Sequence, residues 1–379
     1  MKAKFITFYV LIIVSFSGIC QKSYWTISGN IVQEKKTPVS SASVFINNTS
    51  IGAFSDVNGS FKLDIPNKFS QIELSIYAVG YKTLKRKINY SPEIQIFKFQ
   101  LENAEALNEA GVSTIDDKDW SKKWKTFEDA IVGDSKFSKE CKIINPSVIN
   151  LNYSHDKKVI ANAKGPILIK NTALGYTIYF MMDKFESDGK NANVSGLKFF
   201  EKNVPDSEIN RIKWEKNRKD IFSDSFRSFL MALTLNKSDV SNFEIFRITT
   251  LKNKTNTQTT VAKELKDGTL VSVNDSEIYS FDKDSESFFL HSELPLLVFV
   301  KKRFQGKPQY TDYPFQYSEI LLPKGNAGFN ENGLLNKPKD IILKGYWGSN
   351  GFSNLLPEDY NTEGLIKEKN EETAVNKND

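Results

Sequence analysis

Short runs of alternating apolar and polar residues fill the first hundred residues of the chain. A period of two is typical of strands that bury one face. It occurs at residues 25–27, 42–46, 59–65, 72–78 and 94–101, and in the last run Phe97 is expected to face away from the other apolar residues. Turn signals recur about every ten residues, which is the spacing of a small sandwich. We therefore predict an all-β sandwich over residues 21–101.

Beyond residue 117 the apolar period changes to that of a helix. The residues that define its face are Trp120, Trp124, Phe127 and Ile131. Two further helices are predicted over residues 207–221 and 224–235, the second with Ser223 as its N-cap. Runs rich in branched and aromatic residues, typical of strands, surround these helices. The prediction for residues 118–362 is a mixed α+β domain.

Two segments show neither the apolar period of a strand nor that of a helix. Residues 102–117 are acidic and contain no aromatic residue, so we interpret them as a linker. Residues 363–379 are highly charged, and no large apolar side chain follows Ile366 apart from Val375. They are predicted to be a disordered tail, because such a segment cannot bury enough apolar surface to fold.

The N-terminus has the pattern of a signal peptide. Lys2 and Lys4 precede a short apolar run, and small residues then lead to a cleavage site after Cys20. The apolar run is shorter than the roughly 20 residues of a membrane span, so no integral span is expected after cleavage. The hypothesis is export to the periplasm or the periphery of an outer membrane. Lipid attachment at Cys20 is the alternative to simple removal of residues 1–20.

The net charge of the chain bears on whether it binds nucleic acid. Loss of Lys2 and Lys4 lowers the formal charge from +5 to +3, and the remaining basic residues are scattered. Nucleic acid is therefore not an expected partner.

Cleavage leaves Cys141 as the one cysteine, so no intramolecular disulfide can form. We predict a buried core thiol, with a reactive thiol as the alternative.

Residues 51–63 contain the most specific local signal. They read as two strands joined by Asn58-Gly59, a pair typical of a type I′ hairpin in which both residues have positive φ. With Ser28-Gly29, Pro38-Val39 and Val79-Gly80-Tyr81, this stretch resembles the carboxypeptidase regulatory-like domain. The resemblance implies a transthyretin-like or Ig-like sandwich, which is an architectural module and does not by itself define a reaction.

A second set of motifs follows in a consistent order. They are Leu174-Gly175-Tyr176, residues 214–218, Gly345-Tyr346-Trp347 and residues 355–360. From residue 24 to about residue 360, the chain resembles the secreted carboxypeptidase-like regulatory domain-containing proteins of the Bacteroidota, a family to which no activity is assigned. Relatives tend to have His and Arg where this chain has Ser228 and Met231.

The residues argue against zinc peptidase and nucleotide chemistry. Catalytic zinc needs about three protein ligands, usually with two or more histidines. The chain has only His155 and His291, and neither begins a His-x-x-Glu motif. Glycine-rich phosphate-binding motifs are also missing from the sequence. We therefore predict no metal, no cofactor, no nucleotide and no catalytic residue.

Two polar or aromatic groups are candidates for binding. The first is a helix face on which Glu208, Arg211, Glu215 and Arg218 follow one another at spacings of three or four, with Trp214 beside them. Arginines there could hold a carboxylate or a sugar acid; the alternative is a set of intrahelical ion pairs. The second candidate is Tyr346 with Trp347, beside a glycine-rich loop. Packing at a domain edge is the alternative for this pair.

Two functional hypotheses follow. The first is a non-catalytic envelope protein that binds or scaffolds another envelope protein or a glycan through the sandwich and the α+β domain. The alternative is a carboxylate-dependent hydrolase that uses Glu208 or Glu215. Unpaired strand edges of the sandwich are candidate partner surfaces under the first hypothesis.

Overall fold

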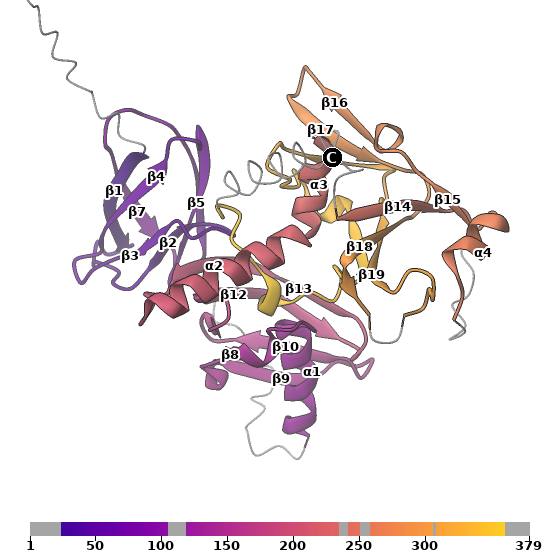
Figure 1. Cartoon of the computed structure of the whole chain (residues 1–379). Helices are drawn as coiled ribbons and strands as arrows, with labels where there is room; N and C mark the ends of the chain where they lie inside the picture. Colours follow the sequence, from indigo (N-terminus) through magenta and orange to yellow (C-terminus); the bar gives the residue numbers. More distant parts are fainter. Residues whose placement is uncertain (1–23, 105–118, 235–241, 251–257, 306–307, 361–379) are drawn as a thin grey trace, which may run out of the picture.

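The computed structural model describes residues 24–104, 119–234, 242–250, 258–305 and 308–360 (Figure 1). The predicted signal peptide with Cys20, most of the predicted linker and the predicted charged tail lie outside these residues. Figure 1 shows the N-terminal strands on one side, strands β14–β19 on the other, and helix α2 between them. Within the described residues, none of the helices combines the length and the apolar character needed to cross a membrane.

The N-terminal part is a two-sheet sandwich, as the alternation predicted. One sheet has the order β4-β1-β7, formed by β1 (Tyr24–Gln33), β4 (Ser60–Pro66) and β7 (Gln95–Leu101). The other has the order β3-β2-β5-β6, formed by β2 (Ser43–Ile46), β3 (Gly52–Phe54), β5 (Gln71–Tyr77) and β6 (Leu84–Asn89). Strand β1 pairs antiparallel with β4 and parallel with β7. Fully buried aliphatic residues such as Ile27, Val44 and Leu74 fill the space between the sheets.

The hairpin predicted around Asn58-Gly59 is wrong in two respects. Strands β3 and β4 belong to different sheets, so the turn carries the chain from one sheet to the other. Gly59 has a φ of +71°, but Asn58 does not have a positive φ. The Asp56 carboxylate accepts the N–H groups of Asn58 and Ser60 at 2.9 and 2.8 Å. Gly59 is required for space as well, since a Cβ there would lie 2.3 Å from the Ile31 carbonyl oxygen.

The predicted facing of strand β7 is also wrong. Phe97 stacks on Phe99 toward the core, and Leu101 is fully buried. Ile94 and Ile96 are 57% and 80% exposed. Alternation places residues 97, 99 and 101 on one face, and this face covers the sandwich core.

The α+β part begins with helix α1 (Trp120–Val132), which packs on a six-stranded sheet. The strands are β8 (Cys141–Ile143), β9 (Ile149–Tyr153), β10 (Val159–Ala163), β11 (Ile167–Asn171), β12 (Tyr176–Ser187) and β13 (Ala192–Lys202). The order is β8-β11-β12-β10-β9, with β13 paired to β12. Phe127 and Ile131, on the predicted apolar face of α1, are fully buried in the core over this sheet.

Two helices, α2 (Glu208–Ser223) and α3 (Phe226–Thr234), connect this sheet to the last part of the chain. Ser223 was the predicted N-cap of α3, and this is wrong. The Ser225 hydroxyl accepts the Ser228 N–H at 3.0 Å, so α3 begins after Ser225. The Ser223 hydroxyl instead donates to the Asp220 carbonyl at 2.9 Å.

The last part has a core of its own between two small sheets and α3. A five-stranded sheet has the order β15-β14-β18-β19-β21, and a three-stranded sheet has the order β16-β17-β20. Their bounds are β14 (Phe243–Ile248), β15 (Leu270–Ser272), β16 (Tyr279–Asp282), β17 (Ser287–His291), β18 (Leu296–Phe304), β19 (Phe315–Leu321), β20 (Asn326–Phe329) and β21 (Ile342–Gly345), with helix α4 at Val261–Lys266. The predicted order of a sandwich followed by an α+β region is confirmed.

The sandwich is docked on strand β13 through the loop between β2 and β3. The Asn48 N–H donates to the Lys198 carbonyl at 2.8 Å, and the Phe200 N–H donates to the Thr49 carbonyl at 3.0 Å. The Phe199 ring packs against Phe45, with 5.8 Å between ring centroids. We call loop 46–50, strand β13 and the C-terminal segment 355–360 together the joint.

The C-terminal segment closes the joint from the other side. Its Glu358 N–H donates to the Asn48 carbonyl at 2.8 Å. The Asp359 carboxylate accepts the backbone N–H of Ser50 at 2.7 Å and its hydroxyl at 2.5 Å. The first and the last described segments of the chain are thus hydrogen-bonded to each other.

Substitution Phe199→Ala tests the docking. The ring is 4% exposed, so its removal should lower the free energy of unfolding by about 3–5 kcal/mol, as for other buried phenylalanines. Urea denaturation of the protein without residues 1–20 measures this. Exposed Ile96→Ala is the control and should change stability by less than about 0.5 kcal/mol. An equally small effect of Phe199→Ala would contradict a packed joint.

Candidate functional site

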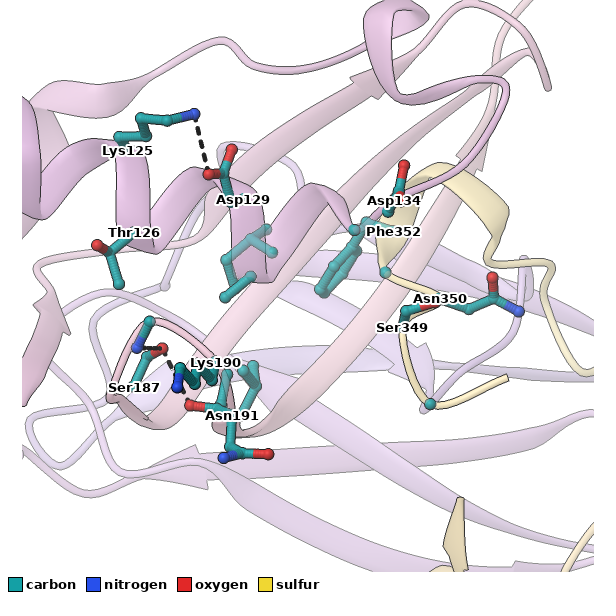
Figure 2. Close-up of a pocket in the computed structure, with 18 of the residues that line it drawn as sticks. Lys125, Thr126, Asp129, Asp134, Ser187, Lys190, Asn191, Ser349, Asn350 and Phe352 are labelled. Atoms are coloured by element: carbon teal, nitrogen blue, oxygen red, sulfur yellow. Dashed lines mark hydrogen bonds and ion pairs between the residues drawn. The ribbon is translucent and has the colours of Figure 1, made fainter. Parts of the chain in front are cut away.

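A groove of about 970 Å³ lies between helix α1, the turn from β12 to β13, and loop 348–355 (Figure 2). Its polar side chains include Lys125 and Asp129 from α1, Lys190 and Asn191 from the turn, and Asn350 from the loop. Lys125 and Asp129 form an ion pair of 3.1 Å along the exposed side of the helix. The lining thus combines lysines, amides and hydroxyls from three separate elements.

Two facing glycines form one end of the groove. Helix α1 ends at Gly133, whose φ is +76°. A Cβ on Gly133 would lie 2.2 Å from the Gly351 nitrogen, and a Cβ on Gly351 would lie 2.5 Å from the Ile131 carbonyl oxygen. The Ser353 hydroxyl donates to the Val132 carbonyl at 2.7 Å. The glycines let loop 348–355 contact the helix end, and these contacts fix this wall.

The β12–β13 turn forms the opposite wall. Asp188 Oδ1 accepts the N–H groups of Lys190 and Asn191, both at 2.7 Å. These backbone donors hold the pKa of Asp188 below its usual value. The Ser187 hydroxyl donates to the Asn191 carbonyl at 3.1 Å. The turn is therefore braced by its own side chains, and its backbone donors are already occupied.

Lys198, from strand β13, lies at the inner side of the groove. Its Nζ is 5.7 Å from the centroid of the Phe180 ring and 5.9 Å from that of Phe352. Burial lowers the pKa of Lys198, and the charge of Glu358 partly opposes this shift. Among the described residues, none forms a hydrogen bond or an ion pair with this ammonium group.

Lys198 also belongs to a half-buried cluster of charges at the joint. Burial raises the pKa of Glu358, although the Asn48 amide donates to its carboxylate at 2.9 Å. The charges of Arg227 and Lys198 oppose this shift. Burial also lowers the pKa of Arg227. Glu358, Arg227 and Lys198 are thus half-buried charges that act on one another, and the Asp359 carboxylate acts on Glu358 and Arg227 as well.

The structure divides the predicted face of helix α2 into two groups. Arg211 pairs with both Glu208 and Glu215 on the exposed side; its Nη1 lies 2.6 Å from Glu215. These pairs are intrahelical, at spacings of three and four, as in the alternative interpretation. The Arg211 guanidinium lowers the pKa of Glu208. None of these side chains lines the groove.

Trp214 and Arg218 point instead at the turn that joins β11 to β12. The Trp214 indole N–H donates to the Thr172 carbonyl at 2.8 Å, and its ring covers Gly175, where a Cβ would lie 2.3 Å from the indole. Arg218 lies 4.3 Å from the centroid of the Tyr176 ring and donates to the Leu174 carbonyl at 2.7 Å. Both side chains fasten α2 to the sheet.

Tyr346 and Trp347 also lie outside the groove lining. Trp347 is 5% exposed, packs against Phe229 and Phe243, and donates its indole N–H to the Asp224 carbonyl at 2.8 Å. Tyr346 is half-buried, and burial raises its pKa. The glycine-rich loop that directed attention to this pair does line the groove, through Ser349 and Asn350.

The other candidates for chemistry, Cys141, His155 and His291, do not line the groove. Cys141 is 3% exposed, and burial raises its thiol pKa to about 12, so the prediction of a core thiol is confirmed. His155 and His291 belong to no group of three potential metal ligands within the part of the chain that the structure describes. Sequence reasoning missed Lys198, Lys190 and Asn191. Lys198 has no local signal, because it stands in the middle of a strand.

The fold defines a β-sandwich protein in which the sandwich is docked on a larger α+β part. Residues 27–112 match the family model described as CarboxypepD_reg-like domain, so the N-terminal sandwich is a carboxypeptidase regulatory-like domain. No curated protein matches the chain.

Solved structures match small parts of the chain. One is an interface mutant of a type II cohesin–X-dockerin complex from Acetivibrio cellulolyticus, with 17% identity, a TM-score of 0.19, and coverage of 21% of this chain and 58% of that chain. Another is catechol 1,2-dioxygenase from Acinetobacter sp. ADP1 inhibited by bound mercury, with 12% identity, a TM-score of 0.18, and coverage of 23% and 55%. The chain spans little more than half the length of these structures.

Substitution Glu358→Gln tests the charged cluster. Because the pKa of folded Glu358 is raised, its carboxyl holds a proton more tightly in the folded than in the unfolded protein. The wild type should therefore lose stability, relative to the variant, as pH rises from about 4 through the raised pKa toward about 8. Urea denaturation across this range measures the difference, with exposed Glu331→Gln as the control. A constant difference between Glu358→Gln and wild type would contradict the assignment.

Proposed function

We propose that this is a non-catalytic, exported protein of the cell envelope that binds or scaffolds another envelope component, a protein or a glycan. The periplasm or the periphery of an outer membrane is the proposed location. The observation that carries the proposal is the groove between α1, the β12–β13 turn and loop 348–355, which presents polar side chains from three braced elements. Polar groups held in place before a ligand arrives favour specific binding, because little ordering entropy is then lost.

The residue types in the groove support binding over catalysis. Its lining contains no histidine, cysteine or glutamate, and its carboxylates are Asp129 and Asp134. Asp129 is paired with Lys125. A general base or nucleophile needs an activating partner within hydrogen-bond distance. The lining offers amides and ammonium groups, which suit recognition.

The alternative, a carboxylate-dependent hydrolase, has weaker support. Glu208 and Glu215 lie on an exposed helix face, and Arg211 pairs with both. The lowered pKa of Glu208 favours its ionised form, whereas a general acid requires a raised pKa. The two carboxylates are more simply explained as partners of Arg211.

The sandwich itself offers a scaffolding surface. Strand β3 lies against β13, since the Phe199 ring contacts Gly52 and Phe54, and Thr49 in the loop before β3 forms a parallel bridge with Phe199. Strand β6 pairs only with β5, and strand β7 only with β1, so their outer edges are open among the described strands. Open edges are natural sites for an additional strand from a partner.

A retention experiment tests the function. The protein without residues 1–20 is immobilised and exposed to envelope glycans and envelope extract, and peptide and glycan hydrolysis is assayed in parallel. We expect retention of a defined component without turnover. The double variant Lys190→Ala, Asn350→Ala should weaken retention by about tenfold or more, while Arg211→Ala, on exposed α2, should leave it unchanged. Turnover that Glu215→Ala abolishes in a folded protein would favour the hydrolase instead.

A further inference from the structure

We propose that the groove binds an acidic glycan, with a sugar carboxylate paired to the ammonium group of Lys198. This inference rests on the proposed binding function and assigns the chemistry of the ligand. It places the recognising cation on strand β13, away from the arginines of helix α2 that the sequence had suggested for a sugar acid.

The environment of Lys198 is the first argument. Its ammonium group lies over the rings of Phe180 and Phe352, which give a cation only modest stabilisation. Glu358 acts on it through charge, without an ion pair of 4.0 Å or less within the described residues. Lys198 is half-buried, and shielding a cation even partly from water without such a partner costs free energy. A ligand carboxylate in the groove would supply the missing acceptor.

The charge of the lining is the second argument. Lys122, Lys125, Lys190 and Lys198 line the groove together with Asp129 and Asp134. Four cations against two carboxylates leave a positive balance, and one of the carboxylates is already held by Lys125. Such a surface attracts an anionic ligand and disfavours a cationic one.

The remaining polar groups favour a sugar acid over a phosphate. Phosphate sites commonly use free backbone N–H groups or bidentate arginine. The N–H groups of Lys190 and Asn191 donate to Asp188, and no arginine lines the groove. Lys198 with the amides of Asn191 and Asn350 matches one carboxylate among hydroxyl groups.

The same groups favour a sugar over an acidic peptide. An extended peptide usually binds by adding a strand to a free sheet edge. The groove wall is instead a closed turn whose backbone donors are occupied. What it offers are side chains such as Asn191, Asn350 and Thr126, which can exchange hydrogen bonds with sugar hydroxyls.

The test is a calorimetric titration of the protein without residues 1–20 with tetragalacturonate, and with its methyl ester, which has the same hydroxyls and no carboxylate charge. We expect the acid to bind and the ester to bind at least about tenfold more weakly. Lys198→Gln should remove this preference for the acid. Lys202→Gln, an exposed lysine on the same strand outside the groove, should retain it. Added salt should weaken binding of the acid more than that of the ester.

The other outcomes distinguish failure of the acidic-glycan inference from failure of the proposed binding function. Equal binding of acid and ester would overturn the acidic inference and leave the proposed binding function standing. Tighter binding of poly-glutamate than of tetragalacturonate would overturn it in favour of a peptide ligand. If Lys198→Gln does not fold, as judged by circular dichroism, the pair Lys122→Gln, Lys190→Gln decides: an unchanged affinity for the acid overturns the inference. Failure to bind any glycan or envelope component would overturn the proposed function as well.

Discussion

The contact between loop 46–50 and strand β13 is the interaction on which the remaining arrangement depends. Backbone bonds from Asn48 and to Thr49 join this loop to the strand, and the Phe199 ring fills the space behind it. Segment 355–360 then closes over the loop through Asp359 and Ser50. A flexible tether between two domains would leave their relative position free. The joint fixes it, since the sandwich is hydrogen-bonded both to strand β13 and to segment 355–360, while Leu355 and Leu356 of that segment pack against the core of the six-stranded sheet.

The joint also positions the groove. The backbone carbonyl of Lys198 accepts the Asn48 N–H, and its side chain reaches the Phe352 ring. Loop 348–355, which lines the groove, continues directly into segment 355–360. Movement of the sandwich would therefore shift both the inner side and one wall of the groove. Under the proposed function, the carboxypeptidase regulatory-like domain would brace the groove in the α+β part. The outer edges of its strands β6 and β7 are unpaired among the described strands.

Local patterns in the sequence predicted the strands and helices whose formation depends on nearby residues. Alternation identified the sandwich, and the spacing of Phe127 and Ile131 identified the buried face of α1, because one face of each must leave water. Asn58-Gly59 misled, because the side chain of Asp56 sets that turn and because a turn does not determine which sheet receives the next strand. The position of Lys198 in the groove could not be predicted, because segments distant in the sequence surround it. The loop after Trp347 was found through aromatic residues that serve the core.

Differential scanning calorimetry of the protein without residues 1–20 tests the joint most directly. If the sandwich and the six-stranded sheet are one cooperative unit, they should unfold in a single transition whose van't Hoff and calorimetric enthalpies agree. A separate transition with the enthalpy of a sandwich of about 80 residues, roughly 50–60 kcal/mol, would show that the sandwich unfolds by itself. That result would contradict the claim that the joint couples the sandwich to the groove.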